Sequence, residues 1–174
     1  MTVMTTGLRK LMLTAHVVFS VGWLGAVASF LALSLAGLLN SDPQLVRAAY
    51  LGMDLLGWSV ILPLSLASLI TGTVQALGTV WGLFRHYWVL IKLVITALAT
   101  AFLLLHLQAV TEMARIASAS ELSPGEMMGM RTQLLVDAGA ALLVLLVATV
   151  LSVYKPRGLT RYGRARATDG ASRP

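Results

Sequence analysis

Residues 88–110 read WVLIKLVITALATAFLLLHLQAV, an apolar run interrupted only by Lys92, His106 and a few small polar side chains. At about 1.5 Å per residue, a helix of this length crosses the roughly 30 Å hydrocarbon core of a bilayer. The run therefore predicts a membrane-spanning helix. Because an ionisable group inside such a helix is energetically expensive, Lys92 and His106 require a functional explanation.

Three further runs have the same character and decide the fold class. The four predicted helices are residues 11–39, 51–81, 88–110 and 134–154, in a chain that is 57% hydrophobic and 11% charged. This composition is typical of a membrane protein and excludes an ordinary soluble domain. We predict an all-α fold, an integral membrane four-helix bundle, within residues 1–154. Residues 155–174 form a basic tail that we predict to be disordered.

Absent residues and motifs exclude several chemistries. The chain has no cysteine, which excludes disulfides, thiolate metal sites and covalently attached c-type haem. It has no phosphate-binding glycine loop, no HExxH motif and no meaningful Ser-His-Asp spacing, so hydrolysis is unsupported. The first apolar run is too long for the hydrophobic region of a signal peptide, and we expect it to be retained.

The distribution of basic residues predicts the orientation. With both termini inside, the inner side carries ten of the thirteen Lys and Arg residues, and the outer side carries Arg47, Arg115 and Arg131. This bias follows the positive-inside rule and predicts a multi-pass protein of the bacterial inner (plasma) membrane. The basic tail suits anionic lipid headgroups better than nucleic acid.

Local signals predict how the helices begin and pack. Ser41 or Asp42, before Pro43, is a candidate N-cap for a short interfacial helix, and Ser123 is a candidate N-cap in the loop before the last helix. Pro63 is expected to kink the second helix. Gly72 is expected to allow a close helix approach.

His16 and Lys92 are predicted to lie at one depth. Each falls about one turn into a helix that starts on the inner side, so the two groups share the inner leaflet. Ordinary alternatives exist for both residues. The long side chain of Lys92 can snorkel to the interface, and His16 can simply hydrogen-bond to a neighbouring helix.

The second histidine of this helix, His106, extends a polar stripe. Fourteen residues separate it from Lys92, which leaves the two about 40° apart around the helix and about 21 Å apart along it. The predicted inward-facing stripe is Lys92, Thr96, Ala99, Leu103 and His106.

Acidic residues are predicted near the outer end of that stripe. Asp54, Asp137 and Gln133 are candidates for an outer cluster with His106, in which a carboxylate orients the imidazole or relays protons. Alternatively, Asp54 and Asp137 mark hydrated helix ends. His86 fits an interfacial residue and is not a predicted ligand.

Two kinds of metal chemistry follow from these residue types. Inward histidines in a four-helix bundle are a common setting for haem, and imidazole or deprotonated lysine can supply axial ligands. His16, Lys92 and His106 are therefore the predicted cofactor-binding residues, with His16 and His106 as metal ligands. Thioethers bind Cu(I), so Met127, Met128 and Met130 are candidate copper ligands, although methionine is also a flexible apolar filler.

Several short motifs resemble a known group of membrane proteins. The first helix contains Leu13-Thr14-Ala15-His16 and Gly22-Trp23-Leu24-Gly25, the second contains Pro63 and Thr71-Gly72, and the third contains Trp88–Leu93 followed by His106. Over residues 11–110 the chain resembles a bacterial branch of integral membrane proteins around the HemJ-type protoporphyrinogen oxidases and CopD-type copper-resistance proteins.

The resemblance implies a four-helix core with haem b between the helices. In the HemJ type, a helix-1 histidine and the lysine of a W-x-x-x-K segment are implicated in haem binding, and His16 and Lys92 match these positions. The chain lacks the Tyr-His-rich signature of the oxidase, so the resemblance bears on the cofactor more than on the reaction.

Three functions from different classes are therefore expected. The first is a b-type haem protein that transfers electrons or oxidises a small hydrophobic reductant, such as a quinol or a porphyrinogen, as a membrane oxidoreductase. The second is a copper-handling protein or small-solute transporter. The third is a haem-free scaffold subunit that packs against a partner or another copy of itself.

Overall fold

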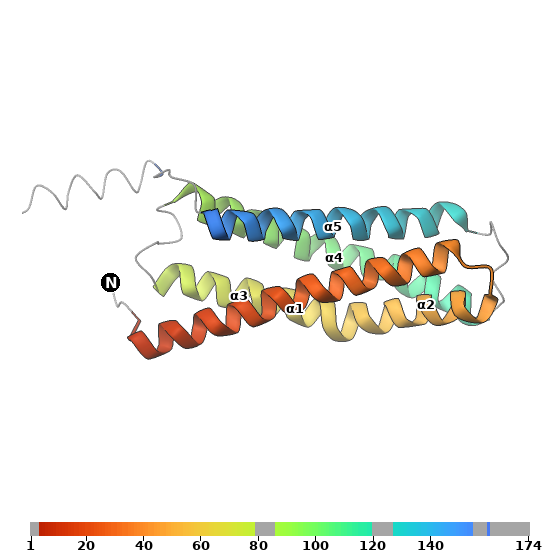
Figure 1. Ribbon diagram of the computed structural model, residues 1–174, viewed down its shortest axis with the longest axis horizontal. Helices are drawn as coiled ribbons and strands as arrows, with labels where there is room; N and C mark the ends of the chain where they lie inside the picture. The colour runs from red at the N-terminus through yellow and green to blue at the C-terminus, as the bar shows by residue number, and fades with distance from the viewer. Residues whose placement is uncertain (1–3, 79–85, 120–126, 155–159, 161–174) are drawn as a thin grey trace, which may run out of the picture.

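The four predicted helices form a single bundle (Figure 1). The structure is a computed structural model that describes residues 4–78, 86–119, 127–154 and 160. Its spans are α1 (Thr6–Leu39), a continuous span of α2 (Pro43–Leu56), η1 (Gly57–Ile61) and α3 (Leu62–Gly78), then α4 (Tyr87–Ala119) and α5 (Met128–Tyr154). All four spans are long and apolar enough to cross a membrane. The all-α, four-helix prediction is confirmed.

The helices are longer than the apolar runs that predicted them. α1 begins at Thr6, α4 continues to Ala119 and α5 begins at Met128. Polar residues continue these helices beyond the apolar segment; in the extension of α4, for example, Arg115 Nε donates to Glu112 at 2.8 Å. The predicted tail, apart from Thr160, and the predicted helix start at Ser123 lie outside the described residues.

Asp42 begins the second span as predicted. Its Oδ1 accepts a hydrogen bond from the backbone N–H of Gln44 at 3.0 Å, and Pro43 is the first helical residue. The predicted short interfacial helix is instead the first part of the membrane span, since the chain continues from α2 through η1 into α3 without a break.

A π-turn accommodates the proline in this span. Pro63 has no N–H, and its ring clashes with the carbonyl four residues earlier in a regular helix. In η1, just before Pro63, the N–H of Leu62 bonds to the carbonyl of Gly57, one residue further back than in an α-helix. Such a wide turn is a common form of helix distortion. The distortion predicted at Pro63 therefore takes the form of η1.

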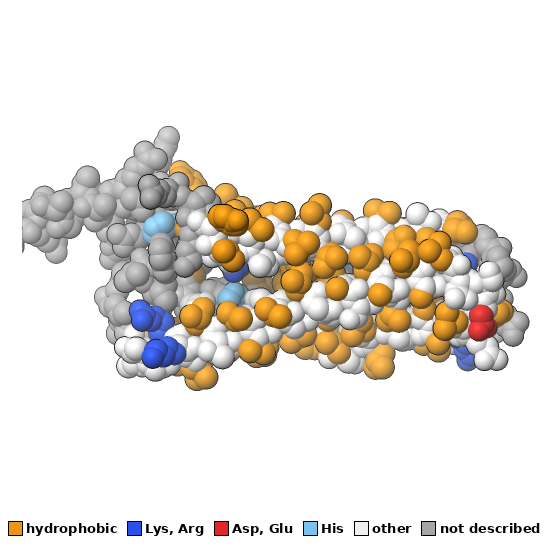
Figure 2. All heavy atoms as spheres, viewed as in Figure 1, with side chains coloured by type: hydrophobic (Ala, Val, Ile, Leu, Met, Phe, Trp, Pro, Cys, Tyr) orange, Lys and Arg blue, Asp and Glu red, His pale blue; other side chains and the backbone are white. Residues whose placement is uncertain are grey.

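The surface of the bundle matches a lipid environment along its sides and water at its ends. Apolar side chains cover the sides, whereas Lys and Arg gather at the end near the N-terminus and acidic groups appear at the opposite end (Figure 2). Leu105 is 68% exposed and Val153 is 70% exposed, which is favourable in hydrocarbon and unfavourable in water.

Arg131 lies inside the bundle, contrary to its expected place among the outer loop charges. It is buried in α5, where its Nε donates to the hydroxyl of Tyr50 at 3.0 Å and its Nη2 donates to the carbonyl of Gly37. The guanidinium also lies 5.8 Å from the centre of the Tyr50 ring. Because α5 begins at Met128, six residues earlier than predicted, Arg131 lies within the helix and connects α1, α2 and α5.

Gly37 is essential to this connection, and its substitution tests the packing. A Cβ at Gly37 would lie 2.8 Å from Cζ of Tyr50, a ring that is almost fully buried. We expect Gly37→Ala to destabilise the protein by about 1–3 kcal/mol through overpacking. The measurement is the free energy of unfolding in mixed micelles under increasing denaturing detergent.

Gly25→Ala is the matched control for Gly37→Ala. Gly25 lies in the same helix, and a Cβ there meets nothing within 4 Å. Both substitutions share the gain in helix propensity from Gly to Ala. Equal stability of the two variants would contradict the packing described for Tyr50.

Candidate functional site

His16 and Lys92 meet inside the bundle. Nζ of Lys92 lies 3.3 Å from Nε2 of His16, which joins α1 to α4 across 76 positions of sequence. The prediction that the two groups share one depth is confirmed, and they are also direct neighbours. A polar contact of this kind within a membrane span stabilises groups that hydrocarbon would otherwise leave without partners.

The partners of the second ring nitrogen of His16, Nδ1, determine which nitrogen carries the proton. Nδ1 lies 3.1 Å from the backbone carbonyl of Ser68 and 3.2 Å from Oγ1 of Thr71. A carbonyl can only accept, so Nδ1 carries the proton and donates it. In the neutral ring, Nε2 is then an unprotonated nitrogen, with its lone pair free to accept from Lys92 or to bind a metal ion.

Small residues bring α1 and α3 close enough for this contact. A Cβ at Gly72 would lie 2.9 Å from the His16 ring, so only glycine leaves room for the ring there. Four residues along α3, the hydroxyls of Ser20 and Ser68 form a hydrogen bond of 2.8 Å between the same two helices. The close approach predicted at Gly72 is confirmed, and the absence of a side chain there leaves the space that the His16 ring occupies.

A large cavity adjoins the His16–Lys92 pair. Its volume is about 850 Å³, and it is bounded by α1, α3, α4 and α5. Most of its lining is apolar, including Leu13, Trp23 and Trp88. Cavities of about 300–1,000 Å³ with few polar groups are typical of sites for cofactors and small molecules. Figure 2 shows a histidine and a basic side chain within a hollow of the molecular surface.

The charged residues described in the lining of the large cavity are all basic. Arg9 and Lys10 contribute to its lining on the side of the N-terminus, and Lys92 lies further inside. Among the described residues that line the cavity there is no Asp or Glu. An apolar space with basic groups is complementary to an amphipathic anion, with an apolar body inside and its negative groups at Arg9 and Lys10.

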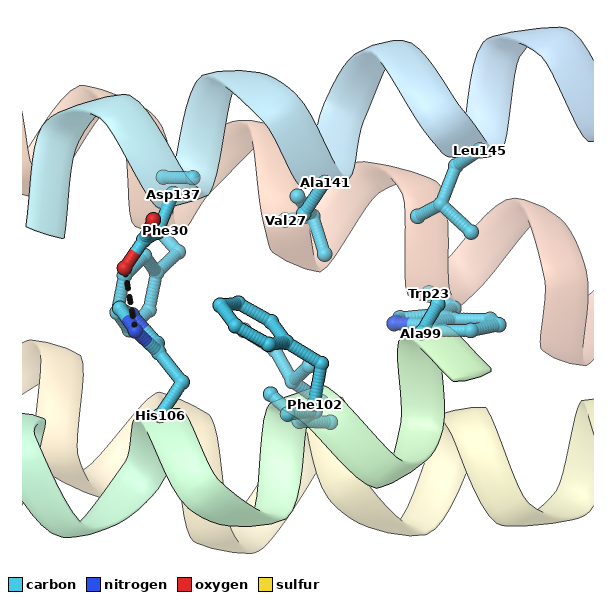
Figure 3. Close-up of a pocket in the computed structure, with 12 residues that line it drawn as sticks. Trp23, Val27, Phe30, Ala99, Phe102, His106, Asp137, Ala141 and Leu145 are labelled. Atoms are coloured by element: carbon cyan, nitrogen blue, oxygen red, sulfur yellow. Dashed lines mark ion pairs between the residues drawn. The ribbon is translucent and has the colours of Figure 1, made fainter. Parts of the chain in front are cut away.

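A second and smaller cavity lies beside His106. Its volume is about 50 Å³, and most of its lining is apolar or aromatic. In Figure 3, His106 of α4 and Asp137 of α5 lie at one end of it, while Trp23 and Leu145 lie at the other. Trp23 and Leu145 also line the large cavity, so these two side chains separate the two spaces.

The predicted stripe on α4 lines both cavities in order. Lys92 and Thr96 face the large cavity, and Ala99, Leu103 and His106 face the small one. The inward direction of the stripe is thus confirmed. Helical periodicity alone was sufficient to predict it, since all five residues lie on one face of one helix.

The outer acidic residues divide between two places. Asp137 Oδ2 lies 3.1 Å from Nδ1 of His106, so the approach of these two residues is confirmed. Asp54 instead accepts a hydrogen bond of 2.6 Å from Thr111, whose hydroxyl oxygen also accepts from Nε1 of Trp58 at 3.0 Å. Gln133 is exposed. The outer cluster is therefore His106 with Asp137, and Asp54 serves a separate contact between α2 and α4.

The remaining candidates lie apart from both cavities. Met127 and Met128 are exposed at the start of α5, whereas Met130 packs against the hydrophobic core. His86 precedes α4, and its ring lies 6.4 Å from that of Trp88. Within the described part of the chain, no three His, Cys, Asp or Glu side chains gather into a metal site.

Several residues of the site were not predicted from sequence. Arg9 and Lys10 were interpreted only as orientation signals, and Ser68 and Trp23 were not singled out as site residues. A detectable signal existed on α3, where Ser65, Ser68 and Thr71–Gly72 place small polar residues on one face of an apolar helix.

Comparison of the chain with protein-family models, with curated proteins and with solved structures finds no match. The resemblance to the HemJ and CopD types therefore stays a prediction, and the functional conclusions below depend on the geometry of the site.

The position of the His16 ring can be tested by substituting Gly72. We expect Gly72→Ala to displace the imidazole and to weaken its hydrogen bond to the carbonyl of Ser68, because the added Cβ overlaps the ring. 15N NMR of histidine-labelled protein should show a changed Nδ1 signal and faster exchange of its proton.

Gly139→Ala supplies the control for Gly72→Ala, since a Cβ at Gly139 meets nothing within 4 Å. An unchanged His16 signal in Gly72→Ala would show that the two helices are further apart than described.

Proposed function

We propose that this protein binds b-type haem in the large cavity and transfers electrons or oxidises a small hydrophobic reductant, such as a quinol or a porphyrinogen. One observation carries the proposal. Nε2 of His16 and Nζ of Lys92 lie 3.3 Å apart beside a cavity of about 850 Å³, whose described lining residues include Arg9 and Lys10 and no acid.

The donor set fits a haem. A porphyrin supplies four nitrogens to its iron, so the protein needs to add only one or two axial ligands. Nε2 of His16 has the required protonation state, because the carbonyl of Ser68 holds the proton on Nδ1. A backbone carbonyl in this position is the usual partner of a metal-binding histidine.

Lys92 has two roles compatible with this site. The present 3.3 Å separation is a hydrogen-bond distance, so an ion held between the two nitrogens requires Lys92 to move. Its four-carbon side chain allows that movement. It either becomes the second axial ligand or stays charged and pairs with a propionate group.

The remainder of the cavity fits the rest of the cofactor. Apolar walls exclude water from a macrocycle, and the basic groups of Arg9 and Lys10 complement two carboxylates. When bound, haem supplies reversible one-electron chemistry. The chain's own contribution is to hold the iron through His16, to orient the ring and to keep the cavity dry.

Copper handling has less support from the same contacts. A cation path along α4 meets Lys92 and the basic groups of the large cavity, which repel it. Of the candidate thioethers, Met130 packs against the core, consistent with a packing role.

The absorption spectrum of the purified protein tests the proposal. After expression with added haem precursor, we expect a Soret band when the protein is oxidised and a sharp α-band when it is reduced with dithionite. His16→Ala should lose both, with haem content by the pyridine haemochrome assay falling more than about tenfold. Lys92→Met should shift the bands if Lys92 is an axial ligand and should only weaken binding if it pairs with a propionate.

His86→Ala is the matched control, because it removes a histidine outside both cavities. A colourless wild-type protein, even with haem supplied, would refute the haem proposal. In that case copper content, measured with and without Met127 and Met128, becomes the next test.

A further inference from the structure

Two buried polar atoms beside the small cavity have no hydrogen-bond partner among the described residues, Nε2 of His106 and Oδ2 of Asp137. Nε2 of His106 is buried, and no described residue forms a hydrogen bond with it. The side chain as a whole is only 9% exposed. A buried polar atom without a partner is costly and points to a bound group that is not part of the protein chain.

The imidazole is held in a defined position. Phe102 stacks on it with ring centres 6.1 Å apart, and Phe30 approaches from α1 at 6.0 Å. On its other side, Nδ1 lies 3.1 Å from Oδ2 of Asp137. Figure 3 shows the His106 and Asp137 side chains directed toward each other at one end of the cavity.

The carboxylate determines which nitrogen is basic. Asp137 favours a proton on the adjacent Nδ1, which leaves Nε2 as the free basic nitrogen of the ring. If Nε2 gains a proton, the resulting positive charge is balanced by Asp137. Among the lining residues from α1, η1, α4 and α5, these are the only two titratable groups.

The size of the cavity limits what can bind. A water molecule needs at least about 10–15 Å³ of such space and two to four polar partners. The small cavity offers about 50 Å³, with the His106 nitrogen and the Asp137 carboxylate in its lining. It therefore admits one or two waters, or the hydroxyl end of a longer molecule, but no macrocycle. A haem bound at His106 is therefore not part of our proposal.

We propose that the small cavity holds an O–H group against Nε2 of His106, and that the His106–Asp137 pair accepts its proton. This step rests on the proposed oxidation of a quinol-type reductant. When one electron leaves the quinol for a one-electron acceptor in the large cavity, an O–H bond breaks. Its proton forms the new Nε2–H bond, and Asp137 balances the charge.

The location of the pair supports this role. Trp23 and Leu145 are the walls shared by the two cavities, so a longer molecule with its hydroxyl end at His106 extends through the small cavity toward the space proposed for the electron acceptor. The large cavity lacks a carboxylate in its lining, and its imidazole already has partners at both nitrogens. His106 is the described histidine of the cavities that still has a free nitrogen.

The experiment is 15N NMR of the full-length, haem-free protein in lipid nanodiscs, with labelled histidine and with His106→Gln to assign the signal. We expect the Nε2 signal of His106 to show a hydrogen bond. If a short-chain quinol supplies the O–H group, the signal changes when the quinol is added. If water supplies the O–H group, the signal shows exchange with bulk water and does not change when the quinol is added.

Two carboxamide variants test the contribution of the carboxylate. Asp137→Asn should abolish the hydrogen-bonded Nε2 signal, while Asp54→Asn, which alters a carboxylate of α2 that lines neither cavity, should leave it unchanged. An Nε2 signal without a hydrogen bond in every condition, or a wild-type signal in Asp137→Asn, would overturn the proposal. Because the protein is haem-free, this result does not depend on the haemochrome assay.

Discussion

The contact between the amine of Lys92 and the imidazole of His16 is the constraint around which the half of the bundle nearer the N-terminus is arranged. Neither group can be left unpartnered within a membrane span without a large cost in free energy. Each therefore needs a partner from another helix, and together they join α1 to α4. The backbone carbonyl of Ser68 adds α3 to the same network through Nδ1 of His16.

That network explains residues that hydrophobicity alone does not. Gly72 is required because the imidazole occupies the space of its Cβ, and the Ser20–Ser68 hydrogen bond holds the same two helices together. At the far end, Arg131 has a comparable role for α1, α2 and α5 through Tyr50 and Gly37. Polar contacts at both ends thus position helices whose apolar faces discriminate weakly between partners in lipid.

Periodicity along one chain segment predicted much of this structure, and contacts between segments account for the rest. The direction of the Lys92–His106 stripe follows from the 100° rotation per residue, and the common depth of His16 and Lys92 follows from the helix rise. The rotation of one helix against another has no such rule. The sequence therefore did not reveal that Ser68 holds His16, that Asp54 pairs with Thr111, or that Arg131 is buried.

The two cavities differ in charge, and this difference explains why they adjoin. The large cavity contains Arg9, Lys10 and Lys92 without an acid, which favours an anionic occupant and opposes the accumulation of protons beside it. The small cavity contains Asp137 beside a free imidazole nitrogen, which favours a proton. Oxidation of an O–H group separates an electron from a proton, and the two products require environments of opposite charge. Trp23 and Leu145 line both cavities and separate the two environments, which is the arrangement that the proposed oxidation of one reductant requires.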